Sequence, residues 1–427
     1  MAITLHSLIT VAAELLGAVL SAEQGADHTL SRYFQDHPRF GSRDRRILAD
    51  AVYGCLRRLR SLGYILGQPE HPNWRLTKFE AQTRLAAWIL NEGNEKREEI
   101  NAILGAEINL LPANIAISRP PAVAADLPDW LYDALTLELG TTEVQTLAAA
   151  LVLPALLDLR VNTLRTNRGE VIRQLQEAGI EATPTPLSPV GLRLPARTSL
   201  MESELYRQGL VEIQDEGSQL IGQLLAPRRH EIVVDFCAGA GGKTLHLGAL
   251  MANTGTLHAF DPVPRRLDQL RSRIERAGIT TVRSARIDNL AAPPILALRG
   301  KVDRVLVDAP CTGTGTLRRS PDIKWRHHNL TRLTTEQKQI LATAATLVRP
   351  GGRLVYATCS LLRAENEAIV EDFLASHPDF VLIPPDTSLA RLNIPPDLLS
   401  KEAQALRLYP HRHATDGFYA ALLARHR

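Results

Sequence analysis

The sequence predicts a multidomain protein in which an all-α domain and a small α+β domain precede an α/β Rossmann-like domain. The chain has 427 residues, which is too long for one ordinary domain. Apolar residues recur at helical spacing through residues 1–140, whereas short strands and a helix are mixed over residues 141–226. Strands and helices then alternate regularly over residues 227–427. Alternation of this kind indicates a doubly wound parallel sheet.

The first apolar run, from Leu8 to Ala22, resembles the core of a signal peptide but lacks its charge pattern. Glu14 interrupts the run and no Lys or Arg precedes Arg32, whereas a signal peptide begins with positive charge. The 4 cysteines form no Cys-x-x-Cys pair, so neither a zinc site nor a disulfide framework is indicated. We therefore expect a helix here, in a cytoplasmic protein with free thiols and no bound metal.

Apolar stripes predict the helices of the first domain. Residues 43–60 place Ile47, Ala51 and Cys55 on one face and arginines on the opposite face. Cys55 is therefore expected to be a structural core thiol rather than a reactive one. Further helices are expected over residues 79–90 and 98–110.

Prolines and a change of pattern introduce the second domain. Several prolines mark residues 114–128 as a linker, and the proline-rich stretch 184–195 is expected to be irregular. Apolar spacing predicts the other elements, and Gly179 ends one of the helices. These elements are helices over 128–153 and 168–178, and strands over 157–161 and 209–213.

Positive charge is concentrated in the last domain. The whole chain has a net charge of only +3, but residues 227–427 hold 28 Lys and Arg against 19 Asp and Glu. A basic domain favours a polyanionic partner such as a nucleic acid. Solvated arginine-rich faces are also common in proteins without such a partner.

A glycine-rich turn follows the first strand of the α/β domain. Residues 231–235 form an apolar strand that runs into Phe236-Cys-Ala-Gly-Ala-Gly-Gly-Lys-Thr244 and then into a helix. Glycines let the backbone approach a ligand closely, and the helix N-terminus offers unpaired N–H groups. The turn is not a P-loop, because that motif needs a glycine where Cys237 stands.

Carboxylates follow the next two predicted strands. Asp261 follows a strand over residues 256–260, and Asp288 follows a strand over residues 281–287. In nucleoside-binding folds, a carboxylate at the tip of the second strand holds the ribose hydroxyls. We therefore expect a nucleoside cofactor at this edge, although Asp in such places is also common as a helix cap or turn residue.

Two cysteines also follow buried strands. Cys311, in Asp308-Ala-Pro-Cys311, comes after a strand over residues 302–307, and Cys359, in Thr358-Cys359-Ser360, comes after a strand over residues 353–357. Ligands bind at the carboxyl ends of parallel strands. Two thiols there, beside a carboxylate and a glycine-rich turn, indicate nucleophilic chemistry. The residues alone leave open which thiol is the nucleophile.

A basic segment with one aromatic residue follows Cys311. It places Arg318, Arg319, Lys324 and Arg326 around Trp325. Cationic groups interleaved with an aromatic ring suit RNA phosphates and an unstacked base. The alternative is that Trp325 anchors this segment in a hydrophobic core.

Five sequence motifs are informative because they occur together and in one order along the chain. They are Ile213-Gln-Asp-Glu-Gly-Ser-Gln219, Asp308-Ala-Pro-Cys311-Thr-Gly-Thr-Gly315, Pro321-Asp-Ile-Lys-Trp325, Val355-Tyr-Ala-Thr-Cys359-Ser360 and Pro410-His-Arg-His-Ala-Thr-Asp-Gly-Phe418. Together they make almost the whole chain resemble the Sun/RsmB family of RNA (cytosine-5)-methyltransferases. Residues 44–62 resemble the NusB-like RNA-binding domain of the family members that act on bacterial rRNA.

The resemblance implies a class I methyltransferase domain over residues 227–427 that takes its methyl group from S-adenosylmethionine. The family's turn usually reads Cys-Ala-Ala-Pro-Gly-Gly-Lys-Thr, so Gly239 and Ala240 replace an Ala-Pro pair in this chain. Without the proline, the backbone should be looser. The implied cofactor contacts come from Asp261, Asp288, Asp308 and the turn residues Cys237, Ala238, Gly239, Ala240, Gly241, Gly242 and Lys243.

The implied reaction is methylation of C5 of a cytidine in 16S rRNA. A thiolate that adds to C6 makes C5 nucleophilic, and the resemblance assigns this attack to Cys359 and assistance in product release to Cys311. Asp308 is the candidate for stabilising charge at N3, and Lys243 is expected to contact Asp308 or the base.

Two other functions stay open at this point. One is a non-catalytic RNA-binding factor in ribosome assembly, and the other is methylation of tRNA or another RNA. DNA methylation is disfavoured by the NusB-like segment and by Thr358-Cys359-Ser360. We expect a monomer, because no long apolar stripe is left over.

Overall fold

The computed structural model describes residues 3–68, 70, 72–91, 97–108, 119–195, 200–389, 392, 399–400 and 404–427. Contacts within the chain divide it into two compact units. The first consists of Met1–Pro154 and Thr316–His328, and the second of Ala155–Gly315 and Asn329–Arg427. The domain limits expected at residues 140 and 226 stay predictions, since the second and third expected domains share one unit.

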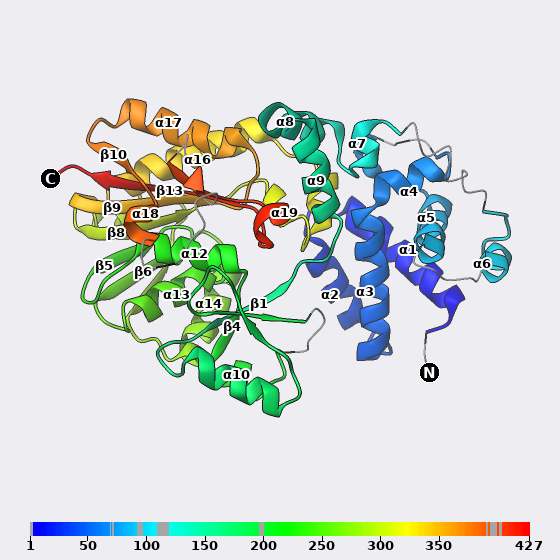
Figure 1. The fold of residues 1–427 in the computed structure, drawn as a ribbon, viewed down its shortest axis with the longest axis horizontal. Coiled ribbons are helices and arrows are strands. Elements are labelled where there is room, and N and C mark those ends of the chain that lie inside the picture. The colour runs from blue at the N-terminus through cyan, green and yellow to red at the C-terminus, as the bar shows by residue number, and fades with distance from the viewer. Residues whose placement is uncertain are drawn as a thin grey trace. The chain divides into compact units, whose positions relative to one another are not determined.

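The first unit is helical (Figure 1). Leu16 of α1, Leu48 and Leu56 of α3 and Leu85 of α5 are fully buried in one cluster, as amphipathic helices require. Cys55 is fully buried in the same cluster, which confirms it as a core thiol. The helices are α1 (Leu5–Ser21), α2 (Ala26–Asp36), α3 (Ser42–Arg57), α4 (Leu59–Ile65), η1 (Pro72–Trp74), α5 (Lys78–Asn91), α6 (Arg97–Leu104), α7 (Pro121–Ala124), α8 (Asp129–Leu139) and α9 (Thr141–Leu151).

The predicted linker over residues 114–128 differs from the structure where the structure describes it. Pro121 begins the short helix α7, and Ala122 and Val123 of that helix are buried. The buried carboxylate of Asp126 accepts hydrogen bonds from the Ser61 N–H and hydroxyl at 2.9 and 2.8 Å. Residues 119–128 are therefore packed against the helical core. The helix predicted to reach residue 110 ends at Leu104, where Gly105 follows with a φ of +62°, and residues 109–118 lie outside the described residues.

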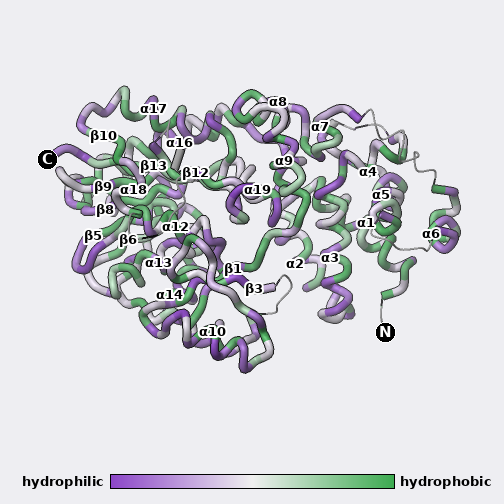
Figure 2. Tube along the Cα trace, in the orientation of Figure 1, coloured by the Kyte–Doolittle hydropathy of each residue, from purple (hydrophilic) through white to green (hydrophobic). Residues whose placement is uncertain are grey.

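A small antiparallel sheet begins the second unit. Its order is β2 (Thr183–Pro184), β3 (Gly191–Leu194), β1 (Leu157–Val161) and β4 (Val211–Ile213), and α11 (Glu204–Arg207) leads into β4. Hydrophobic and hydrophilic residues alternate along α10 (Arg168–Glu177), which buries Val171 and Leu175 (Figure 2). The prediction that 184–195 is irregular is wrong for β3, because Leu192 and Leu194 alternate into the core.

The large sheet of the second unit contains the expected parallel strands. Its order is β11 (Leu399–Ser400), β12 (Ala405–Leu408), β13 (Phe418–Arg425), β9 (Val348–Thr358), β8 (Val302–Asp308), β5 (Ile232–Asp235), β6 (Thr256–Asp261) and β7 (Val282–Arg286), with β10 (Phe380–Ile383) paired to β13. Strands β5 to β9 are parallel, while β13 is antiparallel to β9. The predicted α/β Rossmann-like fold is thus confirmed.

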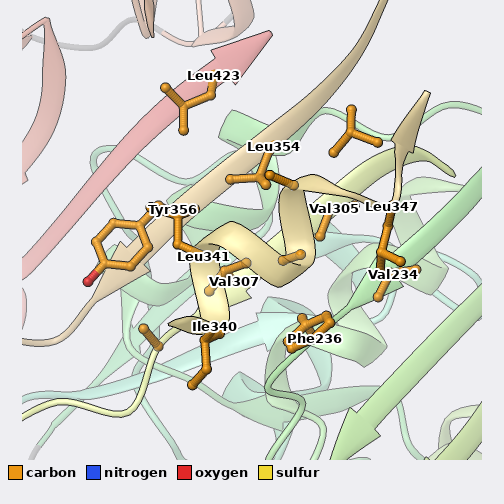
Figure 3. Close-up of a cluster of buried hydrophobic side chains, with 14 of the residues drawn as sticks. Val234, Phe236, Val305, Val307, Ile340, Leu341, Leu347, Leu354, Tyr356 and Leu423 are labelled. Atoms are coloured by element: carbon orange, nitrogen blue, oxygen red, sulfur yellow. The ribbon is translucent and has the colours of Figure 1, made fainter. Parts of the chain in front are cut away.

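Helices cover both faces of this sheet (Figure 1). Ile340 and Leu341 of α16 pack over Val305, Val307 and Leu354 on one face (Figure 3). On the other face, α12 and α13 pack over the alternate strand positions, which include Leu306 and Val355. The remaining elements are α12 (Glu216–Leu225), α13 (Gly242–Leu250), α14 (Pro264–Ala277), α15 (Pro293–Leu296), η3 (Thr314–Thr316), η4 (Pro321–Trp325), α16 (Leu330–Ala345), η5 (Arg363–Glu365), α17 (Glu367–Ser376), α18 (Asp386–Leu389) and α19 (Pro410–His413).

The strand order reverses at β5. The chain runs from β5 to β6 and β7 on one side, and then continues with β8 and β9 on the other side. Ligands of open α/β sheets bind at such a reversal, beyond the carboxyl ends of the strands. In the described part of the chain, no helix is long and apolar enough to cross a membrane.

Candidate active site

The two cysteines at the ends of β8 and β9 lie side by side. Asp308 is paired in register with Ala357, so the turns that follow the two strands start at the same level. The sulfur atoms of Cys311 and Cys359 are 3.4 Å apart, and both residues are partly exposed. The structure therefore brings together two thiols that are separated by almost fifty positions in the sequence.

The surroundings of Cys311 favour its protonated form. Its hydrogen bond to Cys359 raises the pKa of the Cys311 thiol well above its ordinary value, and burial and the nearby Glu365 carboxylate add to the rise. A thiol is a poor nucleophile compared with a thiolate. The environment of Cys311 thus favours a thiol that donates a hydrogen bond to its neighbour.

An ion pair closes the other side of the site. Lys243, on the first turn of α13, places its Nζ 2.7 Å from Oδ2 of Asp308 at the end of β8. Burial alone would lower the pKa of Lys243, but the Asp308 carboxylate and Cys359 outweigh burial, and the pKa is raised. Lys243 is therefore a charged ammonium group, as expected from its contact with Asp308.

Two glycines shape the turn after β5. Gly239 has a φ of +55° and Gly241 a φ of +90°, both in the region that favours glycine. A Cβ on Gly241 would lie 2.2 Å from Leu270 Cδ1, whereas a Cβ on Gly239 would meet nothing within 4 Å. Gly241 thus allows the turn to pack against α14, and open space lies beside Gly239.

Two arginines, Arg160 buried and Arg273 partly exposed, hold the carbonyl groups of this turn. Arg273 of α14 donates to the carbonyl of Ala240 at 2.8 Å, and Arg160 of β1 donates to the carbonyl of Gly242 at 2.7 Å. Glu212 of β4 forms an ion pair with Arg273 at 2.9 Å, and burial lowers the pKa of Arg160 to about 9. Sequence reasoning missed these residues, because nothing local connects β1, β4 and α14 to the turn.

The two predicted nucleoside carboxylates have different surroundings. Asp261 at the end of β6 is buried and accepts hydrogen bonds from the backbone N–H groups of Gly239 and Val263 at 2.9 and 2.8 Å. Asp288 is 61% exposed and pairs with Arg286. Asp261 therefore borders the glycine-rich turn directly, whereas Asp288 is exposed and held in an ion pair with Arg286.

Comparisons with known proteins show the family of this chain. The model of the family described as 16S rRNA methyltransferase RsmB/F matches residues 222–424, and an RsmF/B-like ferredoxin-like domain model matches residues 127–200. A probable ribosomal RNA small subunit methyltransferase B of Synechocystis is 32% identical, over 93% of this chain and 94% of that protein. The chain belongs to the RsmB/F family of methyltransferases.

Other similar proteins agree with membership of the RsmB/F family. The ribosomal RNA small subunit methyltransferase B of Yersinia pseudotuberculosis is 27% identical, over 97% of this chain and 98% of that protein. The crystal structure of the protein PH0851 is 28% identical with a TM-score of 0.78 and covers 99% of both chains. That of a methyltransferase homologue from Pyrococcus horikoshii is 29% identical with a TM-score of 0.61, over 71% of this chain and 97% of that one.

RsmB/F enzymes depend on S-adenosylmethionine, and the residues of this chain fit that cofactor. The open space beside Gly239 leaves room for a ligand against the backbone. The first turn of α13 has N–H groups without helical partners, which suit the carboxylate of a methionine moiety. Asp261 and the partly buried Cys237 flank the same turn. These residues would hold the cofactor, which supplies the methyl group.

The basic segment of this RsmB/F chain lies in the helical unit, where it is largely buried. Trp325 Nε1 donates to the carbonyl of Leu56 at 2.7 Å, and Lys324 Nζ donates to the carbonyl groups of Arg57 and Asp126 at 2.8 and 2.7 Å. Burial lowers the pKa of Lys324 to about 8. For Lys324 and Trp325 the structure therefore favours the anchoring alternative over contact with RNA.

The three arginines of this segment are placed differently from one another. Arg318 is buried and donates to the carbonyl of Pro154 at 3.2 Å. Arg319 is half-buried, and Arg326 is partly exposed and forms an ion pair with Asp322. Arg326 also borders a groove of about 510 Å³ in the helical unit, which is lined by residues that include Trp74, Arg75, Trp130 and His327.

Proposed function

We propose that this protein transfers a methyl group to C5 of a cytidine in 16S rRNA through a covalent adduct with Cys359. The observation that carries the proposal is the pair of thiols 3.4 Å apart, next to the Lys243–Asp308 ion pair. Cytosine C5 is a poor nucleophile, and one thiol is enough to activate it. A second thiol within contact distance supplies a group for the step that follows methylation.

The first step is addition of the Cys359 thiolate to C6 of the base. The S–C6 bond forms as the C5–C6 double bond opens, and N3 takes up a proton that the Lys243 ammonium passes on through the Asp308 carboxylate, which leaves Lys243 as a neutral amine. C5 would then bond to the methyl group as the bond between that group and the sulfonium sulfur of the donor breaks. The Lys243 ammonium is well placed for this role because it already donates to Asp308 at 2.7 Å.

The second step releases the product. Once the adduct has formed, Cys311 gives its thiol proton to water, and the resulting thiolate takes the proton from C5. The electron pair restores the C5–C6 double bond as the C6–S bond to Cys359 breaks, and the proton on N3 returns through Asp308 to Lys243. The hydrogen bond to Cys359 is the largest cause that raises the pKa of Cys311. Adduct formation uses up the Cys359 thiol, so it lowers the pKa of Cys311 at the stage at which a base is needed.

The RNA substrate is supported by the relatives and by the helical unit. The relatives from Synechocystis and Yersinia are named as methyltransferases of small-subunit ribosomal RNA. The groove that contains Trp74, Arg75 and Trp130 offers aromatic faces and a cation to an unpaired RNA segment. The NusB-like helical unit is thus the part that we propose to dock on the RNA, in the cytoplasm where 16S rRNA is made.

Bisulfite sequencing of 16S rRNA tests this function. RNA from cells with and without the protein should differ at one protected cytidine, and purified protein with S-adenosylmethionine should restore that protection. If methylation of 16S rRNA were unchanged and methylation of a tRNA changed, the substrate would be tRNA. No change in any RNA, together with no binding of S-adenosylmethionine in calorimetry, would favour the non-catalytic assembly factor instead.

A further inference from the structure

A buried carboxylate connects the two turns that carry the thiols. Glu365 lies in η5 with no exposed surface. It accepts hydrogen bonds from the Thr312 N–H at 2.9 Å and from the Thr312 hydroxyl at 2.5 Å. It also accepts one from the hydroxyl of Ser360 and one from the Gln337 amide at 3.0 Å.

These contacts reach the residue that follows each cysteine. Thr312 comes directly after Cys311, and Ser360 comes directly after Cys359. The Gln337 amide also donates to the carbonyl of Pro310 at 2.9 Å, so the Cys311 turn is held on both sides of the thiol.

We propose that Glu365 is a positioning residue that fixes the distance between the Cys311 and Cys359 thiols. One carboxylate takes donors from both turns, so neither turn moves without losing a buried hydrogen bond. The two thiols act in sequence on one base, and small displacements of reacting groups are expensive in rate. The proposal deepens the proposed function, but the distance itself is measurable without RNA.

The hydrogen-bond pattern predicts different effects for two substitutions. In Glu365→Gln, the amide oxygen keeps the bonds from the Thr312 N–H and from Gln337, while the amide NH₂ donates to the hydroxyls of Thr312 and Ser360. The thiol distance should therefore be preserved. In Glu365→Ala all four donors lose their acceptor. The two turns keep direct links such as the bond from the Gly315 N–H to the Cys359 carbonyl at 2.8 Å, but lose the buried carboxylate that holds the residues next to both thiols.

Oxidation of the thiol pair by diamide measures the distance directly. Diamide takes up the two hydrogen atoms of the thiols and becomes a hydrazine, while one S–S bond forms between Cys311 and Cys359. We expect the rate of disulfide formation, followed by mass spectrometry of peptides, to fall at least about tenfold in Glu365→Ala and to stay within about threefold of the wild type in Glu365→Gln.

A matched control separates positioning from general loosening. Glu216 is another fully buried carboxylate, and it accepts from the N–H groups of Leu187 and Ser188, away from the thiols. Glu216→Ala should leave the rate of disulfide formation unchanged in protein that still melts cooperatively. Equal slowing in Glu216→Ala and Glu365→Ala, or no slowing in Glu365→Ala, would overturn the proposal.

Two milder variants test the same idea during catalysis and guard against failure of Glu365→Ala to fold. Thr312→Val removes the hydroxyl bond from the Cys311 turn to Glu365 and a longer contact with Ser360 at 3.3 Å, so the Cys311 turn should be affected most and RNA–protein adduct should accumulate because product release is slowed. Ser360→Ala removes the bond from the Cys359 turn to Glu365 and the acceptor for the Leu362 N–H at 3.1 Å, besides longer contacts with Thr312 and Thr314, so the Cys359 turn should be affected most and adduct formation itself should be slowed. Equal adduct in both variants would contradict the positioning role, whereas no adduct in any protein would instead contradict the proposed function.

Discussion

Lys243 and Asp308 form an ion pair with Nζ and Oδ2 2.7 Å apart, at the reversal of strand order in the large sheet. Lys243 is only 11% exposed and Asp308 is 30% exposed. Water therefore screens this pair poorly, and the removal of one partner leaves the other charge without compensation.

Replacement of Lys243 by methionine should reduce methyl transfer by at least about a hundredfold, because the proton for N3 comes from this pair. Single-turnover transfer of a labelled methyl group to 16S rRNA measures the effect. Lys338→Met is the matched control, since Lys338 forms a half-exposed pair with Asp372 and should retain the wild-type rate. Full activity of Lys243→Met would refute the transfer of a proton from Lys243 through Asp308 to N3.

Arg273 donates a hydrogen bond to the Ala240 carbonyl. We therefore predict that a second substitution can restore the cofactor affinity that is lost when this bond is removed. Loss of the hydrogen bond in Arg273→Lys should weaken S-adenosylmethionine binding by about tenfold in calorimetry, as expected for a bond to a charged group. Ala240→Pro in the same chain should recover most of that loss, because proline restricts the turn that Arg273 otherwise holds.

Arg271→Lys provides the comparison for this rescue, because Arg271 lies on the same helix and pairs with Asp268 in solvent. Its cofactor affinity should equal that of the wild type. If Arg273→Lys also bound as tightly as the wild type, the arginine would not restrain the turn. A further loss in the double variant would show that proline does not suit this backbone.

The buried carboxyl group of Asp235 predicts a pH dependence of stability. Burial raises its pKa to about 7, against the opposing effect of a hydrogen bond from the Thr244 hydroxyl. The unfolded chain releases this proton near about pH 4, so the folded state binds more protons between the two values. Stability contributed by Asp235 is therefore present at low pH and lost as the pH rises through about 7.

Urea unfolding of the wild type and of Asp235→Asn from about pH 5 to about pH 8 tests this dependence. The free energy of unfolding of the wild type should fall relative to that of the variant as the pH rises. Asparagine cannot ionise but keeps an acceptor for Thr244. If the free energy of unfolding of the wild type, relative to that of the variant, stayed constant or rose with pH, Asp235 would not have a raised pKa.

Trp325 is predicted to matter for folding rather than for base stacking. Trp325→Ala should lower the free energy of unfolding by about 3 to 5 kcal/mol, because it leaves a cavity in the helical core and an unpaired carbonyl group on Leu56. His327→Ala, at an exposed position of the same segment, should change it by less than about 0.5 kcal/mol. If Trp325→Ala were as stable as the wild type but bound RNA more weakly, Trp325 would instead be a residue that stacks on an RNA base.

The active-site residues that directly follow strands could be predicted from the sequence. Regular alternation predicted the parallel sheet, and parallel strands bring their carboxyl ends to one edge. For that reason Asp261, Asp308, Cys311 and Cys359 were identifiable from their positions after apolar runs. The contact between Lys243 and Asp308 was expected only from the family resemblance, as one of two alternatives, and the structure shows it.

Contacts that depend on tertiary packing were not predictable in this way. The sequence gives no local sign that Arg273 binds the Ala240 carbonyl or that Glu365 connects two turns. Trp325 is a similar case, because an aromatic residue among cations is typical both of an RNA-binding loop and of a buried anchor. Only its burial against Leu56 distinguishes the two.

The most direct test of the central claim is the fate of the RNA adduct in single cysteine variants. With S-adenosylmethionine and 16S rRNA, Cys311→Ala should accumulate an RNA–protein species that survives denaturation, because Cys359 still attacks while release is slowed. The double variant Cys311→Ala with Cys359→Ala is the control and should form none. An adduct in Cys359→Ala, with none in Cys311→Ala, would reverse the roles of the two thiols and contradict the mechanism.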